Sequence, residues 1–276
     1  MESAKSHKIT ATVVTEIYEQ VLYKPQLYKF GAGRALLFSA KCPGSDRENQ
    51  DAAAVVSIGD NACVLILADG TGGQPRGADA ARVAVKSVIK SVTEAVNNGG
   101  ELREGILNGF ELANHEVIAF GVGAGTTLCV VEVQDSVASP YHVGDSSITV
   151  AGERGKIKYD SIPHSPVGYA VEAGMMNQKE AIHDQERNIV SNILGYADMR
   201  IEVGPHIPLA LRDTLLICSD GLTDNFLPEE IVERVRTGKL KASMENLAAE
   251  VHQRMTAPLA NQPSAPDDCT VILFRQ

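Results

Sequence analysis

The stretch CVLILADGTGG, residues 63–73, decides the fold of this chain. Its apolar, branched run at residues 63–67 is typical of a strand that is buried on both faces, and the run leads into an Asp-Gly step. The carboxylate of Asp69 is therefore delivered where a strand leaves the core. The stretch TLLICSDGLTD, residues 214–224, repeats this design and delivers Asp220 in the same way.

Two more acidic positions stand beside apolar runs. Asp51 opens the run AAAVV at residues 52–56. The pair Asp267 and Asp268 comes just before the run VILF at residues 271–274. Four such carboxylates would repel one another unless a hard cation neutralised them, and ligation by oxygen atoms alone suits Mg²⁺ or Mn²⁺. The pattern therefore indicates a metal-dependent hydrolase.

An Asp-Gly step also has a plainer interpretation. It is a common turn dipeptide, and a single one after a strand is more often a turn than a metal ligand. Four acidic positions in matched contexts favour the metal-binding interpretation. Gly72 and Gly73 add to it, because backbone without side chains lets a carbonyl group approach a metal or a phosphate closely.

Composition agrees with one globular domain and limits the classes of partner. The chain has 276 residues, of which 44% are hydrophobic and 22% are charged, as in an ordinary soluble protein. Its formal net charge of -10 argues against nucleic acid as a partner, because phosphate backbones are bound by basic surfaces. No apolar stretch is long enough to span a membrane, so we expect no membrane partner and a cytoplasmic location. The five cysteines are odd in number and lack paired metal-ligand spacing, so we expect them to be reduced.

The order of predicted elements is that of an α+β protein. Apolar residues recur at helical spacing over residues 77–96 and again over residues 102–117, which predicts two helices. Strand-like runs follow at residues 126–133 and 140–143. Strands, then two helices, then further strands favour the α+β class over alternating α/β units.

Six motifs together resemble the metal-dependent protein serine/threonine phosphatases of type 2C, the PPM family, in their bacterial form. The resemblance runs from about Phe38 to the end of the chain. Each motif alone would be weak, but six in family order are hard to obtain by chance. The motifs are Asn49-Gln50-Asp51-Ala52, Ala68-Asp69-Gly70-Thr71-Gly72-Gly73, Gly125-Thr126-Thr127, Val143-Gly144-Asp145-Ser146, Cys218-Ser219-Asp220-Gly221-Leu222-Thr223-Asp224 and Asp267-Asp268-Cys269-Thr270-Val271.

The resemblance implies an architecture and a division of the chain. The expected fold is a four-layer sandwich, in which two packed antiparallel β-sheets are flanked by α-helices. Residues 31–276 are expected to form the catalytic domain, with a mobile flap at about residues 162–199. Residues 1–30 are expected to be an N-terminal extension that adds an edge strand or a hairpin.

The resemblance also implies a reaction and a ligand set. The expected reaction is hydrolysis of phosphoserine and phosphothreonine on proteins, with a water or hydroxide held between two Mn²⁺ or Mg²⁺ ions as the nucleophile. Asp69 would bridge both ions, and Gly70 would contribute its backbone carbonyl group. Asp220 and Asp267 would complete the ligands of one ion. Asp51 would act on the other, partly through water.

Three other acidic residues have expected roles outside the two-ion ligand set. By the same resemblance, Asp145 and Asp224 would help to bind a third, weaker metal ion. Asp145 sits in what resembles a Gly-Asp-Ser hairpin turn, so an Asx turn is an equal alternative for it. Asp268 stands where the family usually has Asn, and we expect it to act behind the ligands or to start a strand.

Three positions depart from the family pattern. Gln50 replaces a common Glu and should weaken metal affinity without abolishing it. Thr71 stands where animal members carry a histidine general acid, so the leaving group would take its proton from water. Arg47 lies four residues before Asp51 rather than five, so it would bind the substrate phosphate only if the preceding turn absorbs the shift; a surface role is the alternative, and Arg34 is the next candidate.

Histidines and alternative functions complete the expectations. We expect His164, His183 and His206 to be surface or flap residues, and His142 to be structural.

The preferred partners are phosphorylated proteins, the targets of a serine/threonine kinase in the same cell. A pseudophosphatase that serves as a binding module is the first alternative, and another metal-dependent hydrolase such as a nuclease is the second.

Overall fold

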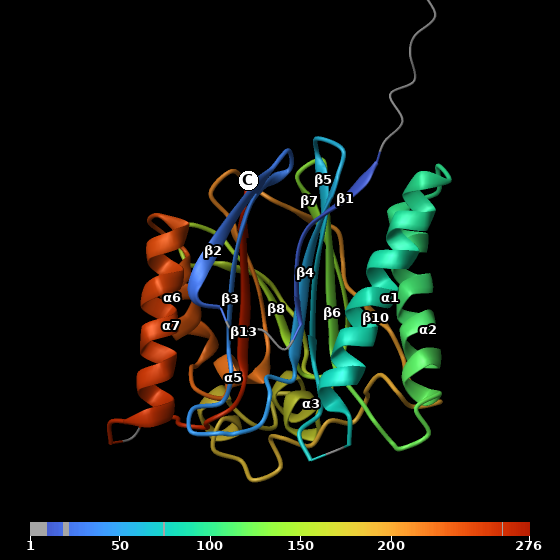
Figure 1. The fold of residues 1–276 in the computed structure, drawn as a ribbon. Coiled ribbons are helices and arrows are strands. Elements are labelled where there is room, and N and C mark those ends of the chain that lie inside the picture. The colour runs from blue at the N-terminus through green and yellow to red at the C-terminus, as the bar shows by residue number, and fades with distance from the viewer. Residues whose placement is uncertain (1–9, 19–21, 74, 261) are drawn as a thin grey trace, which may run out of the picture.

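Two antiparallel β-sheets lie face to face at the centre of this computed structural model, which describes residues 10–18, 22–73, 75–260 and 262–276 (Figure 1). Helices cover the outer face of each sheet. This arrangement confirms the predicted α+β four-layer sandwich. The helices over the first sheet are α1 (Gly77–Asn97) and α2 (Leu102–Ile118), and those over the second are α6 (Pro228–Val235) and α7 (Leu240–Thr256).

The first sheet carries the two strands that the sequence made most prominent. Its order is β1-β4-β5-β6-β7-β10, and β11 also pairs with β7. Its strands are β1 (Ala11–Tyr18), β4 (Asp51–Ile58), β5 (Ala62–Asp69), β6 (Leu128–Gln134), β7 (Val137–Val143), β10 (Glu202–Val203) and β11 (Ile207–Pro208).

The second sheet has the order β2-β3-β13-β12-β8-β9. Its strands are β2 (Leu22–Phe30), β3 (Gly33–Ala40), β13 (Cys269–Arg275), β12 (Thr214–Cys218), β8 (Ser147–Ala151) and β9 (Ile157–Asp160). The predicted strands at residues 214–217 and 271–274 therefore lie side by side at the centre of this sheet.

The first thirty residues contribute one edge strand to each sheet. β1 pairs with β4 of the first sheet, whereas β2 pairs with β3 of the second. β1 and β2 thus lie in different sheets, and β2 forms a hairpin with β3 through the turn after Phe30. Residues 1–9 and 19–21, which belong to the same expected extension, lie outside the described residues.

Side-chain alternation along the strands divides the core into layers. In β4 and β5, Ala53, Val55, Leu65 and Leu67 face the second sheet and are fully buried there. The intervening residues face the helices on the other side, where they pack with α1. Because successive side chains in a strand point to opposite faces, this pattern also fixes where the residues at the strand ends point.

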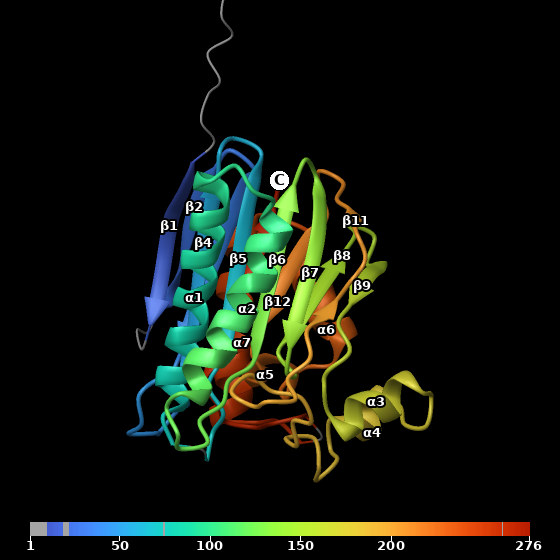
Figure 2. The same ribbon diagram turned by 90° about the vertical axis from the view of Figure 1, so that its right-hand side faces the viewer.

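Three short helices lie at the end of the sandwich opposite the C-terminus. They are α3 (Pro166–Glu172), α4 (Gln178–Ala181) and α5 (Asp220–Thr223). α3 and α4 belong to residues 162–199 and project from the side of the body, as Figure 2 shows. None of the described helices is both long enough and apolar enough to cross a bilayer. All five cysteines are free, and four of them are buried.

Candidate metal centre

The register of the first sheet places two of the predicted carboxylates opposite each other. Asp51, the first residue of β4, pairs with Asp69, the last residue of β5. Both side chains continue the series of Ala53 and Leu67, so they point into the space between the two sheets at its open end. Directly opposed residues of an antiparallel pair have Cβ atoms about 4.5–5.5 Å apart.

The second sheet brings its acidic residues to the same end. Asp220 begins α5 directly after β12, and Asp267 stands two residues before β13. Besides burial, the charges of Asp220 and Asp267 raise the pKa of Asp69, and the charge of Asp267 raises the pKa of Asp220, so these carboxylates lie close to one another. The structure therefore brings together Asp51, Asp69, Asp220 and Asp267 from four different segments.

Asp145 reaches the centre from a crossing between the sheets. Gly144 to Ser146 join β7 of the first sheet to β8 of the second, so the expected hairpin turn is wrong. Gly144 has a φ of 104°, and a Cβ atom there would lie 2.6 Å from the Thr127 Cγ2 atom. Only glycine fits this crossing, which carries Asp145 to the edge of the cluster.

Burial and mutual repulsion disfavour ionised carboxylates in this cluster. Asp51 is only 2% exposed, and burial together with the charge of Asp268 raises its pKa to about 7. The hydroxyl groups of Ser219 and Thr270 partly oppose this rise in pKa. Burial and neighbouring carboxylates also hold the pKa values of Asp69 and Asp220 well above the usual range. A positive charge at this end of the sandwich would relieve these costs.

The surroundings of the Asp51 carboxylate oxygens show whether a cation fits between the sheets. Asp51 Oδ2 accepts a hydrogen bond of 2.9 Å from the Ser219 hydroxyl, but the buried Asp51 Oδ1 has no hydrogen-bond partner within the described part of the chain. A buried carboxylate oxygen without a partner is costly and suits a metal ion. The residues present therefore fit a hard divalent cation.

The fit does not require a complete cage of side chains. In the described ranges, no three histidine, cysteine or carboxylate side chains already stand in an arrangement that could hold a metal ion. Mg²⁺ commonly takes only one or two carboxylates and fills its remaining positions with water or other oxygen atoms. The metal-free carboxylates also repel one another, so they have no reason to converge without the ion.

A threonine pair holds the backbone of Asp69. Its amide donates to Thr127 Oγ1 at 3.0 Å, and its carbonyl oxygen accepts from the Thr127 amide and from Thr126 Oγ1, both at 2.8 Å. The next residue, Gly70, donates its amide to the Gln50 carbonyl oxygen at 3.1 Å. A Cβ atom on Gly70 would lie 2.3 Å from the Gly77 carbonyl oxygen, so the start of α1 can approach only because this residue is glycine.

Asp268 acts behind the cluster by organising the loop before β4. Its Oδ1 atom accepts from the Cys42 amide at 2.7 Å, and its Oδ2 atom accepts from the Gln50 amide at 2.8 Å. The same loop carries Arg47, whose side chain is exposed. Burial raises the pKa of Asp267, and the positive charge of Arg47 partly opposes this rise. Arg47 therefore lies within electrostatic reach of the centre.

Arg34 was the next candidate for binding the substrate phosphate, and Thr71 stands where animal members carry a general acid. Arg34 pairs with Arg275 beside the C-terminus, which is the opposite end of β3 and β13 from Asp267. It therefore cannot replace Arg47 as a phosphate ligand. The Thr71 hydroxyl donates to the Gly125 carbonyl oxygen at 2.6 Å, so this side chain also fastens the loop after β5.

Asp224 meets a cation that the sequence reasoning did not identify. Arg187, from residues 162–199, donates through Nε to Asp224 Oδ2 at 3.1 Å. The two residues line a cavity of about 190 Å³, together with Asp145, Asp220 and parts of α3 and α4. No local pattern marked Arg187, because its partner lies 37 residues away in the sequence.

His164 lies within residues 162–199, where the flap was expected, but it is buried and not on the surface. It is 5% exposed and stacks on His142 with ring centroids 4.4 Å apart. Its Nδ1 atom accepts a hydrogen bond from the Gly144 amide at 3.1 Å and also bonds with Asn192 Nδ2 at 2.8 Å. Burial lowers the pKa of His164 to about 4, so the ring is neutral and can accept. His164 thereby ties the start of residues 162–199 to the crossing that carries Asp145.

Comparison with known families gives one extended match. A family model described as Protein phosphatase 2C matches residues 40–262. Among known proteins, the serine/threonine phosphatase stp of Listeria monocytogenes serotype 4b is 28% identical over 243 residues, which cover 83% of this chain and 90% of that protein.

Two solved structures are similar over nearly their full lengths. Serine/threonine phosphatase Stp1 from Staphylococcus aureus has a TM-score of 0.72 and 25% identity, and the match covers 91% of this chain and 98% of that one. The catalytic domain of the serine/threonine protein phosphatase PstP, solved in complex with 2 manganese ions, has a TM-score of 0.69 and 21% identity. That match covers 88% of this chain and 97% of the other.

Proposed function

This chain belongs to the protein phosphatase 2C family, and from that premise we propose that its acidic cluster holds two divalent ions, Mn²⁺ or Mg²⁺. The chain is a metal-dependent serine/threonine protein phosphatase. The pseudophosphatase alternative is not favoured. A nuclease would need the same carboxylates, but the net charge of -10 disfavours binding of nucleic acid. When bound, two such ions supply an activated water at neutral pH and offset negative charge on the phosphoryl group.

We assign the ligands as the family resemblance implies them, on residues that meet at one end of the sandwich. Asp69 would serve both ions, and the adjoining Gly70 would offer its carbonyl group. Asp220 and Asp267 would complete one site. Asp51 serves the other, and its unpartnered Oδ1 atom is the single observation that carries the proposal. The threonine bonds to the Asp69 backbone keep its carboxylate facing the gap between the sheets.

We assign Asp145 and Asp224 to a third, weaker metal site. Burial and the charge of Asp224 raise the pKa of Asp145 to about 6, which is evidence that the two carboxylates are neighbours. Asp224 already pairs with Arg187, so an ion has to compete with a guanidinium group for it. This competition is a physical reason for weaker binding at the third site than at the first two.

Arg47 is assigned to the phosphate of the substrate. Its guanidinium group is exposed and close enough to oppose part of the rise in pKa that burial causes at Asp267, so it can bind an anion that sits over the centre. It also offsets the negative charge that the cluster would present to an incoming phosphate.

The proposed partners follow from the reaction. The substrates are phosphorylated proteins, and we propose that a serine/threonine kinase of the same cell, in the cytoplasm, modifies them. We further propose that residues 31–276 are the catalytic domain and that residues 162–199 are its flap, whose cavity beside Asp220 receives the chain around the phosphorylated residue.

Metal dependence provides the test. We expect the protein, stripped of metal with a chelator, to lose hydrolysis of a phosphothreonine peptide and to regain it with Mn²⁺ or Mg²⁺. Zn²⁺ should restore activity poorly, because the proposed ligands are all oxygen atoms. Full activity in excess EDTA would overturn the proposal, and metal binding without hydrolysis would return the pseudophosphatase alternative.

A further inference from the structure

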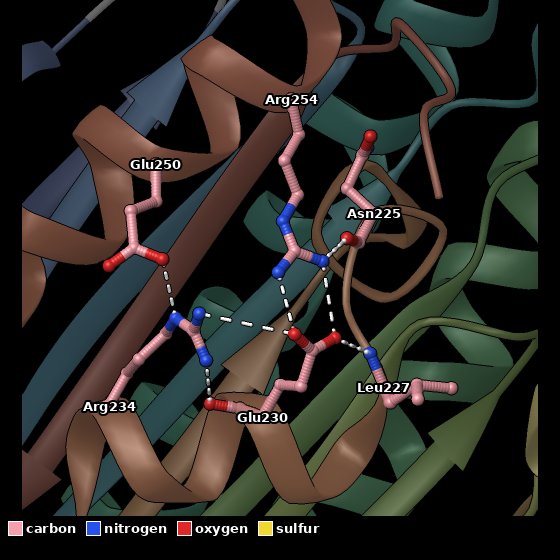
Figure 3. Close-up of polar contacts among 6 residues, drawn as sticks. All are labelled: Asn225, Leu227, Glu230, Arg234, Glu250 and Arg254. Atoms are coloured by element: carbon pink, nitrogen blue, oxygen red, sulfur yellow. Dashed lines mark hydrogen bonds and ion pairs between the residues drawn. The ribbon is translucent and has the colours of Figure 1, made fainter. Parts of the chain in front are cut away.

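A buried arginine lies behind the metal centre, on the helix side of the second sheet. Arg254 of α7 is 4% exposed, and its guanidinium group lies over the Phe226 ring, 3.7 Å from the ring centroid. It donates to both carboxylate oxygens of Glu230 on α6, at 2.6 and 3.2 Å, and to the carbonyl oxygen of Asn225 (Figure 3). Arg254 therefore joins two helices to the segment that follows Asp224.

The side chain of Asn225 continues this connection toward the centre. Asn225 is fully buried, and its Nδ2 atom donates to the carbonyl oxygens of Gly221 at 2.9 Å and Ala265 at 2.8 Å. Its Oδ1 atom accepts from the Ala265 amide at 2.9 Å. One amide group thus binds the turn that holds Asp220 to the loop that ends in Asp267.

The sheet itself does not hold these two carboxylates together. The ladder between β12 and β13 ends at the pair Cys218 and Val271, and one further backbone bond, from the Ser219 amide to the Thr270 carbonyl oxygen at 3.1 Å, also stops short of Asp220 and Asp267. The two aspartates carry like charge, so they repel each other when ionised. Contacts outside the ladder have to set their separation.

We propose that Asn225 and Arg254 are positioning residues that set the separation of Asp220 and Asp267 and thereby the affinity for the ion that these two aspartates share. Asn225 joins the two segments beyond Ser219, whose hydroxyl accepts from the Thr270 amide at 2.9 Å, and Arg254 holds the Asn225 backbone in place. Neither residue touches the substrate. This inference rests on the proposed two-ion centre, and residues behind a metal site commonly change metal affinity about 10- to 100-fold when they are replaced.

Arg234 offers a matched control in the same view. It flanks the same Phe226 ring at 4.9 Å and donates to the Glu230 carbonyl oxygen at 2.8 Å and to Glu250 at 2.7 Å (Figure 3). It also forms an ion pair with Glu230 Oε1 at 4.0 Å, and in the described part of the chain its hydrogen bonds and ion pairs stay within α6 and α7 and do not reach Asn225. Its replacement disturbs the helices without disturbing the two metal-bearing segments.

The experiment compares Asn225→Ala, Arg254→Lys and Arg234→Lys as full-length proteins. Calorimetric titration of the metal-free proteins with Mn²⁺ measures affinity directly. We expect Asn225→Ala and Arg254→Lys to bind one ion about tenfold or more weakly, and Arg234→Lys to bind as the unmodified protein does. In kinetics, the Mn²⁺ concentration for half-activation should rise by the same factor, whereas kcat and KM at saturating Mn²⁺ should stay close to those of the unmodified protein.

Thermal melting in EDTA separates positioning from loss of the fold. If Asn225→Ala is unfolded, Arg254→Lys decides the matter, since it keeps the charge and loses only the paired hydrogen bonds. Unchanged Mn²⁺ affinity in a folded Arg254→Lys overturns the inference, as does an equal loss in Arg234→Lys. An unmodified protein that binds no Mn²⁺ and still hydrolyses phosphopeptide overturns the proposed function as well, which distinguishes the two failures.

Discussion

The two halves of the metal centre are held in different ways. Asp51 and Asp69 are cross-strand partners, so the hydrogen-bond ladder of β4 and β5 fixes their separation. Asp220 and Asp267 lie beyond the end of their ladder, where side chains such as Asn225 fasten one loop to another. The first half is therefore a property of the backbone, and the second depends on particular side chains.

This difference has a consequence for substitution. A ladder tolerates most changes along its length, because backbone groups make its hydrogen bonds. A side-chain network fails when one member is removed, because its buried partners are left unsatisfied. We therefore expect replacements of the ligands themselves to act on chemistry in both halves, and replacements behind the ligands to matter mainly in the second half.

The largest effect is expected for Asp69→Asn in the ladder half. The replacement keeps the volume of the side chain but removes the charge between the two proposed ions, so both sites should weaken together and turnover should fall by orders of magnitude. The metal-free fold should be kept or stabilised, because the change relieves repulsion with Asp51 and Asp220. Phosphopeptide turnover in millimolar Mn²⁺ and melting in EDTA measure the two effects.

Asp60→Asn is the matched control for this substitution. Asp60 lies in the turn between β4 and β5, at the far end of the same pair of strands, and its side chain is exposed. Its replacement should leave turnover unchanged. Near-normal turnover of Asp69→Asn in millimolar Mn²⁺ would mean that the Asp-Gly step is only a turn, and the ligand assignment would lose its central residue.

The next effect is expected for Arg47→Ala, on the loop that Asp268 holds between the two halves. A charge-assisted hydrogen bond to phosphate contributes about 1.5–3 kcal/mol, so kcat/KM should fall about 10- to 100-fold. Mn²⁺ affinity and folding should be nearly unchanged, since Arg47 acts on the anion and not on the metals. Steady-state kinetics measure the change, with Arg34→Ala as the control at the opposite end of the sandwich. Equal kinetics for Arg47→Ala and the unmodified protein would assign Arg47 to the surface.

The contrast between local backbone pairing and distant side-chain contacts also explains which features the sequence predicted. Apolar runs and helical stripes predicted the buried strands and the helices α1 and α2, because burial imposes a period on the sequence. The step from a buried strand to Asp69 is local, so it was visible as well. The four-layer fold came from the resemblance and is confirmed by the observed sheets.

Contacts between distant polar residues could not be predicted. The bond between Arg187 and Asp224, the burial of His164 and the contact of Asn225 with Ala265 each join segments that no local pattern connects. The passage of Gly144 between sheets was missed because Gly-Asp-Ser has the same composition in a hairpin turn as in a crossing. Such features depend on the folded chain as a whole.

A smaller effect is expected for Ser219→Ala, which tests the link between the halves. The Ser219 hydroxyl is buried, donates to Asp51 Oδ2 at 2.9 Å and accepts from the Thr270 amide at 2.9 Å. Its removal takes one hydrogen-bond partner from each of two buried polar groups and should lower the free energy of unfolding by about 1–3 kcal/mol. We expect only a severalfold loss of kcat/KM, because no ligand is removed.

Urea unfolding of Ser219→Ala measures this stability change. Ser57→Ala is the control, since Ser57 lies near the other end of β4 and its hydroxyl bonds only locally, to the Gly59 carbonyl oxygen at 3.4 Å. That change should stay within about 0.5 kcal/mol. If both variants unfold alike, the link from Ser219 to Asp51 contributes nothing specific to the centre.

The smallest effect on activity is expected for Ser136→Gly, at the far end of the ladder half. Asp135 and Ser136 join β6 to β7 and have positive φ values of 49° and 65°, which match a two-residue hairpin turn that favours glycine at its second position. The left-handed conformation costs a non-glycine residue about 1–2 kcal/mol, and the greater freedom of unfolded glycine offsets about 0.5–1 kcal/mol of that. The variant should therefore be more stable by about 0.5–1 kcal/mol in urea unfolding. Its turnover should equal that of the unmodified protein, because the ladder from β6 to β5 already fixes Asp69 by backbone bonds. A changed turnover with unchanged Mn²⁺ affinity would mean that strain at this turn reaches Asp69 along the strands, and the ladder half would be less independent of its side chains than its register indicates.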